Sequence, residues 1–166
     1  MAKLWKKGRG TLGAFTPLHG SWVAETDSEL GPVRCHRRLE PILGANYVRL
    51  DARWEFGRGG STRVYEELAV IGKGDDGVVG FWSFTSDGKR SRGSLADVTD
   101  IHPEAIGFEA DMPAGRARMA YWPAQGGGFH WVVESQTKKG WKRFVEHLYR
   151  AAPTAEHLSA FPKSRT

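Results

Sequence analysis

Aromatic side chains are the residues of this sequence best suited to binding a ligand. Seven tryptophans occur among 166 residues, more than the packing of a small core usually takes. Aromatic rings with a few polar neighbours are typical of small-molecule pockets. The sequence therefore predicts a cavity for a small hydrophobic or aromatic molecule, the alternative being that the rings only fill a core. The candidate lining residues lie in successive segments: Trp54, Tyr65, Phe81, Trp82, Phe84, Tyr121, Trp122, Phe129 and Trp131.

Residues that can move protons are present, but their spacing matches no catalytic motif. His130 stands between two aromatic residues, and we count it among the candidate ligand-binding residues. Together with Tyr65 and Tyr121 it is also a candidate acid or base. A neutral histidine facing the cavity, either His130 or His147, can also bind haem iron. The alternative that we favour for both histidines is a side chain pointing outward from an alternating strand.

Motifs for metal or phosphate binding are not found in the sequence. The histidines lack the spacing of a zinc helix, and there is no Cys-x-x-Cys pair. Glu66 and Glu67 are adjacent, so in a strand they point to opposite faces and cannot act on one atom. The glycine-rich stretches "GRGGS" and "QGGGF" are typical of hairpin turns. We expect no metal and no cofactor, with haem as the alternative.

The net charge of +5 permits binding to an anionic partner, but the basic residues do not cluster in one segment of the sequence. Basic pairs such as Arg37-Arg38 stand in separate segments with acidic residues between them, which is typical of a solvated surface. The single cysteine, Cys35, cannot form an internal disulfide, as expected in a reducing compartment. The N-terminus lacks the apolar run of a signal peptide, and no segment approaches the ~20 apolar residues of a membrane span. We expect a cytoplasmic protein that binds neither nucleic acid nor membranes.

Short strands joined by tight turns are expected over most of the chain. Residues 47–56 alternate apolar and polar side chains strictly, which indicates one buried face and one solvent-facing face. Asp-Gly in "SDGK" is a strong hairpin signal. Residues 141–150 fit either an amphipathic helix or a strand with Trp141 and Val145 on one side, and the preceding strands favour the strand.

Such a chain forms a β-barrel or a β-sandwich. Because closure removes exposed strand edges, we predict an all-β, antiparallel, up-and-down barrel of 8–10 strands with a short N-terminal helix as a plug. Residues 1–10 are interpreted as a basic flexible arm, residues 11–152 as the barrel domain and residues 153–166 as a polar C-terminal tail.

Four stretches of the sequence resemble the lipocalin-like, or calycin, superfamily of β-barrels, in particular bacterial members of unknown function. They are "LHGSW", "RRLEPILGANYVRL", "FWSFTSDGK" and "GWKRFVEHLYR", within roughly residues 12–150. In that superfamily a Gly-x-Trp element begins the first strand, after a short helix that closes one end of the barrel. The resemblance implies that Gly20 and Trp22 close the barrel, with Arg143 or Arg150 of the last strand against the tryptophan.

We therefore expect the chain to bind a small hydrophobic or aromatic molecule in a barrel cavity without transforming it. One alternative is an enzyme of the cyclase or isomerase type, as in some calycin-like proteins, which works by positioning its substrate. A further alternative is a haem-binding barrel. The segment "VVGFWSFT" is apolar on both faces, which favours a protein interface such as that of a homodimer.

Overall fold

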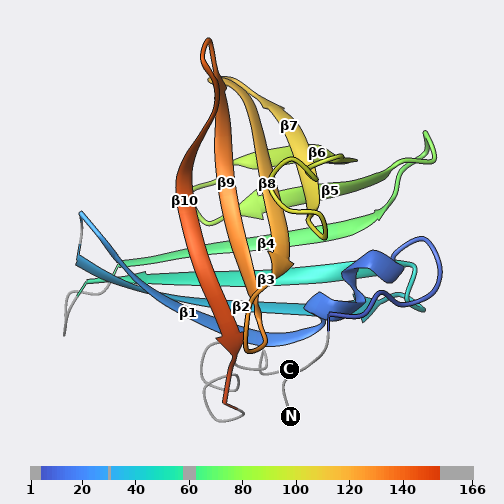
Figure 1. Ribbon diagram of the computed structural model, residues 1–166, viewed down its shortest axis with the longest axis horizontal. Helices are drawn as coiled ribbons and strands as arrows, with labels where there is room; N and C mark the ends of the chain where they lie inside the picture. The colour runs from blue at the N-terminus through green and yellow to red at the C-terminus, as the bar shows by residue number, and fades with distance from the viewer. Residues whose placement is uncertain (1–4, 30, 58–62, 154–166) are drawn as a thin grey trace.

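The alternating segments of the sequence form β-strands, each paired antiparallel with its neighbours. The computed structural model describes residues 5–29, 31–57 and 63–153. These residues form one 3-10 helix and ten strands, which follow one another around a closed barrel until β10 pairs with β1 (Figure 1). The prediction of an up-and-down barrel with a short N-terminal helix is confirmed. The elements are η1 (Gly13–Leu18), β1 (Gly20–Ser28), β2 (Gly31–Ile42), β3 (Tyr47–Phe56), β4 (Arg63–Lys73), β5 (Val79–Thr85), β6 (Arg90–Ala96), β7 (Ile106–Met112), β8 (Gly115–Pro123), β9 (Phe129–Thr137) and β10 (Gly140–Ala151).

The helix η1 covers one end of the barrel. Phe15 and Leu18 of η1 are completely buried. The Trp22 indole Nε1 donates a hydrogen bond of 2.7 Å to the Leu18 carbonyl oxygen, and the Trp22 ring meets Phe129 edge to face at 4.9 Å. Gly20 has a φ of 125°, a conformation that favours glycine, and it lets the chain turn from the helix into β1. Trp22 is therefore held between the helix and the barrel lining.

The two arginines expected to lie against Trp22 lie elsewhere. Arg143 is exposed, and its Nε donates to Glu134 Oε2 at 3.1 Å. Arg150 is also exposed, and its Nη1 donates to the Gln125 carbonyl oxygen at 2.9 Å. Both side chains leave β10 on its outer face, whereas Trp22 is 4% exposed in the core. The structure thus corrects this expectation from the family resemblance.

The last strand contains a β-bulge at Phe144. The segment 141–150 lies within β10, as the strand interpretation predicted. Pairing with β9 runs through Arg143 and resumes at Val145, so Phe144 is the extra residue. A bulge exchanges the faces on its two sides. Val145 packs against the core, whereas Trp141 packs on the outer face, with the Arg118 guanidinium 4.4 Å from its ring. The expectation that Trp141 and Val145 share a side is therefore wrong.

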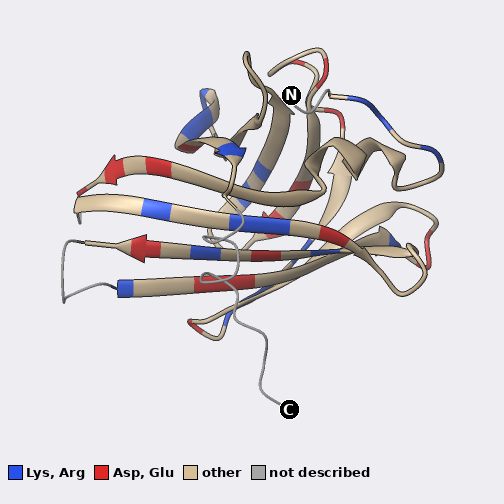
Figure 2. Ribbon diagram, turned by 90° about the horizontal axis from the view of Figure 1, so that it is seen from below, with Lys and Arg blue, Asp and Glu red and all other residues tan. Residues whose placement is uncertain are grey.

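Charged side chains pair along the outer face of the barrel. Figure 2 shows acidic and basic residues interleaved along the strands. The Asp51 carboxylate accepts from Arg38 at 2.9 Å and from Arg49 at 3.0 Å, and Arg53 Nη1 donates to Glu66 at 2.7 Å. Arg49 and Arg53 thus lie on the surface of β3, as their position in an alternating strand indicates.

Part of the N-terminal segment expected to be a flexible arm packs on the barrel. Trp5 contacts the core cluster, and the Gly8 amide donates to the Gly13 carbonyl oxygen at 2.8 Å. Residues 1–4 and 154–166, which hold the rest of the arm and nearly all of the expected tail, lie outside the described residues. In the described part of the chain, no helix has the length and apolar character needed to span a membrane.

Candidate functional site

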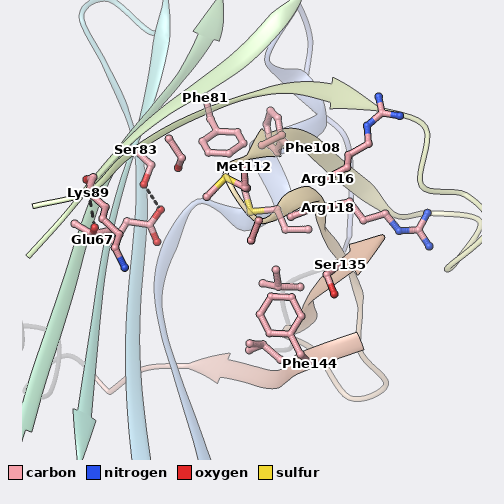
Figure 3. A pocket seen from close by; sticks show the side chains of 18 of the residues that line it. Glu67, Phe81, Ser83, Lys89, Phe108, Met112, Arg116, Arg118, Ser135 and Phe144 are labelled. Atoms are coloured by element: carbon pink, nitrogen blue, oxygen red, sulfur yellow. Dashed lines mark hydrogen bonds between the residues drawn. The ribbon is translucent and has the colours of Figure 1, made fainter. Parts of the chain in front are cut away.

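A cavity of about 610 Å³ lies inside the barrel. Its wall includes residues of the β5–β6 and β7–β8 hairpins, such as Lys89 and Met112 (Figure 3). By the order of the strands, these hairpins are at the opposite end of the barrel from η1. A volume of this size is within the range of small-molecule pockets. The cavity is therefore the candidate site.

Four of the predicted ligand-binding residues line this cavity. They are Trp54 of β3, Tyr65 of β4, Phe81 of β5 and Trp131 of β9. The Trp54 ring lies 5.4 Å from Tyr65 and 6.3 Å from Trp131, centroid to centroid. These rings meet although they come from three strands, because each stands at an inward position of its strand.

Several lining residues were missed by the sequence interpretation. Most of them alternate with outward residues in their strands, so the period of two was the available signal, whereas Phe144 and Val145 are adjacent at the bulge of β10. None belongs to the aromatic series that drew attention. They are Phe56, Phe108, Ala110, Met112, Met119, Val133, Phe144 and Val145. Methionine side chains are flexible and polarisable, so they adapt to ligands of different shape.

Tyr121 and Phe129, two more predicted ligand residues, are buried but belong to the half of the barrel near η1. Phe129 is completely buried against Trp22, and Tyr121 packs on Phe129 with their centroids 5.7 Å apart. Neither ring lines the cavity as the structure describes it. Their place is the packed core beneath the site.

Four other predicted ligand residues lie outside the barrel: Trp82, Phe84, Trp122 and His130. On β5 the inward positions are Phe81 and Ser83, so Trp82 and Phe84 point outward, and Phe84 is 50% exposed. His130 on β9 stacks on Trp122 with ring centroids 5.2 Å apart. These placements follow from the alternation of side chains along a strand. A strand that is apolar on both faces, such as β5, does not reveal in its sequence which face is inside.

A fully buried arginine lies next to the cavity wall. Arg37 of β2 is 1% exposed. Its guanidinium stands 4.1 Å from the Trp131 ring centroid and 5.2 Å from that of Tyr149, and its Nη1 donates to the Tyr121 hydroxyl at 2.5 Å. Within the described residues its Nε and Nη2 have no hydrogen-bond partner. Aromatic faces attract a cation, more strongly when water is excluded.

The sequence interpretation treated Arg37 as part of a surface charge pair, and this was wrong. Arg37 stands in phase with Val33, Cys35 and Leu39, which are all buried on the inner face of β2. The side-chain type suggested the surface, whereas the period of two placed it inside. The position in the alternating pattern was the more informative signal.

Two further titratable groups are buried beside Arg37. His147 is 9% exposed, and burial, with a smaller effect of the Arg37 charge, lowers its pKa to about 4. Burial raises the pKa of the Cys35 thiol to about 12, against the opposing effect of Arg37. At neutral pH both groups are therefore uncharged. The expectation of an outward His147 is wrong, because the bulge at Phe144 sets which residues of β10 point inward.

A glutamate–serine pair is one polar part of the cavity wall, which also includes Thr85, Ser91, Ser135 and basic residues. Glu67 of β4 and Ser83 of β5 both line the cavity, and the Ser83 hydroxyl donates to Glu67 Oε1 at 2.7 Å (Figure 3). The sequence interpretation set Glu66 and Glu67 on opposite faces, and the structure agrees: Glu66 pairs with Arg53 on the outside. The sequence interpretation did not, however, assign Glu67 to the ligand site.

The three candidate acid–base residues lie in three different places. Tyr65 lines the cavity, Tyr121 is buried beneath it, and His130 stacks on Trp122 outside the barrel. Among the described residues, no three His, Cys, Asp or Glu side chains converge in a group that could hold a metal ion. What the described residues offer chemically is a largely apolar cavity with one carboxylate, that of Glu67, in its wall.

The fold is a closed, ten-stranded antiparallel barrel, consistent with a lipocalin-like barrel. Comparison of the sequence with models of known protein families and with curated proteins finds no match.

Proposed function

We propose that this barrel binds a small hydrophobic or aromatic molecule in its cavity and releases it unchanged, as a member of the lipocalin-like barrels. The observation that carries the proposal is the cavity of about 610 Å³, lined by aromatic and methionine side chains. Burial of a ligand's apolar surface there stabilises the complex by about 25 cal/mol per Å². The separation of the candidate acid–base groups favours binding over catalysis.

Binding can be measured with N-phenyl-1-naphthylamine, a neutral apolar fluorophore whose emission increases outside water. A cavity-filling variant, Ala110→Phe, adds a ring at a lining position of β7. We expect the folded variant to bind the fluorophore at least tenfold more weakly than the native chain, because the ring occupies part of the same space.

The matched control is Ser94→Phe. Ser94 is exposed on β6 and pairs with Glu109, the neighbour of Ala110, so this variant adds the same ring outside the barrel. Its affinity for the fluorophore should equal that of the native chain. A native chain that does not bind the fluorophore, or equal affinities for both variants, would contradict the proposal.

A further inference from the structure

Glu67 is positioned to contact a molecule inside the cavity. It stands at an inward position of β4, in phase with Tyr65 and Ala69. Ser83 is 3% exposed, and its hydroxyl donates a hydrogen bond of 2.7 Å to Oε1 of Glu67. This hydrogen bond orients the carboxylate and leaves Oε2 free to accept another. An ionised carboxylate only accepts hydrogen bonds, so the group that it suits is a donor.

Four basic residues belong to the cavity wall. Arg90 is exposed and stands opposite Phe84, which points outward from β5. The other three, Lys89, Arg116 and Arg118, are paired with outer carboxylates. Lys89 lies 3.2 Å from Asp87 and is 82% exposed. Arg116 lies 2.9 Å from Glu109. In Figure 3 the side chains of Arg116 and Arg118 point away from the cavity. Inside the cavity an anionic ligand therefore finds little uncompensated positive charge at the three paired residues.

Arg118 is paired in the same way, at 2.8 Å from both Asp100 and Glu134. The Glu67 carboxylate, unlike the three cations above, has no ion-pair partner among the described residues; its hydrogen bond comes from the neutral Ser83 hydroxyl. Arg37 attracts its charge at longer range but is 1% exposed, so a ligand in the cavity meets the carboxylate and not the guanidinium.

We propose that the cavity selects an apolar, preferably aromatic, molecule that carries a protonated amine, with Glu67 as the group that binds the amine. This inference rests on the proposed function and names its ligand class. An ammonium–carboxylate hydrogen bond is roughly twice as strong as one between neutral groups. The rings of Trp54 and Tyr65 also favour a cation near their faces.

Three probes of nearly equal shape test the charge preference. They are 1-naphthylmethylamine, which is cationic at pH 7, 1-naphthylmethanol, which is neutral, and 1-naphthoate, which is anionic. Each is titrated against the native chain by displacement of N-phenyl-1-naphthylamine. We expect the amine to bind most tightly and the carboxylate most weakly. In Glu67→Gln the preference of amine over alcohol should fall at least tenfold.

The control variant is Glu66→Gln, which makes the same change of charge one residue away, on the outer face where Glu66 pairs with Arg53. It should keep the preference of the native chain. A second variant, Ser83→Ala, removes the hydroxyl that orients the carboxylate and should reduce the preference by less than Glu67→Gln does.

The inference is overturned if the carboxylate binds the native chain best, or if Glu67→Gln and Glu66→Gln keep the same preference. The inference is also overturned if the fluorophore binds the native chain but the amine binds no more tightly than the alcohol. In that case the proposed function still stands. If neither the fluorophore nor any probe binds, the proposed function itself has failed.

Discussion

Replacing Trp22 by alanine should destabilise the barrel without changing what the cavity binds. Trp22 is 4% exposed, so the change removes a buried ring and leaves a hole, which costs about 3–5 kcal/mol for a large aromatic residue. This range includes the loss of the hydrogen bond to Leu18 and of the edge-to-face contact with Phe129. For a chain of this size the melting temperature should fall by roughly 6–20 °C.

Trp22→Phe divides this loss into its parts. It keeps a ring against Phe129 but leaves the Leu18 carbonyl oxygen without the indole donor, and we expect it to cost about 1–3 kcal/mol. Urea unfolding followed by circular dichroism measures both variants, since fluorescence changes when a tryptophan is removed. Affinity for N-phenyl-1-naphthylamine should stay within twofold, because Trp22 does not line the cavity as described. An alanine variant that loses less than about 1 kcal/mol, or a folded one with tenfold weaker binding, would refute the reasoning.

Two further predictions concern pH and the β8–β9 turn. The pKa of His147 is about 4 in the folded chain, whereas its ordinary value, which we take for the unfolded chain, is 6.5. Between these two pH values the unfolded chain binds the proton more readily, so the free energy of unfolding falls as the pH falls. With allowance for water near the ring, the free energy of unfolding should be roughly 2 kcal/mol lower at pH 4.5 than at pH 7. Urea titrations at the two pH values should show a smaller difference in His147→Gln. A Cβ at Gly128 would lie 2.0 Å from the Tyr149 carbonyl oxygen, whereas at Gly126 the nearest atom is Arg150 Nη1 at 3.8 Å, and both glycines have positive φ. Gly128→Ala should therefore cost roughly 2–3 kcal/mol and Gly126→Ala about 1 kcal/mol in the free energy of unfolding, and equal losses would contradict the clash.

The strands and their order were predictable because they depend on local patterns. Residues 47–56 alternate so strictly that β3 (Tyr47–Phe56) matches the predicted segment. The Asp-Gly turn in "SDGK" lies between β5 and β6, as expected. Hairpins connect neighbours along the chain, so a run of strands with short turns leads to an up-and-down barrel.

Assigning side chains to the inside was less successful where residue type and position in the pattern disagreed. Arg37 and Glu67 are charged, yet both stand at inward positions of their strands. Trp82 and Phe84 are apolar, yet both lie outside. His147 is inward because Phe144 forms a bulge, and a bulge has no reliable signature in a single sequence.

The sequence by itself determined that this chain forms short antiparallel strands joined by tight turns, and it predicted that these strands close into a barrel. These features follow from the period of two and from turn residues, which act over a few positions. Only the tertiary structure decided that Glu67 and Ser83 meet in the cavity wall and that Arg37 lies among Trp131, Tyr121 and Tyr149. The physical reason is that closure brings together side chains far apart in the chain, and the register of each strand sets which of them face the interior.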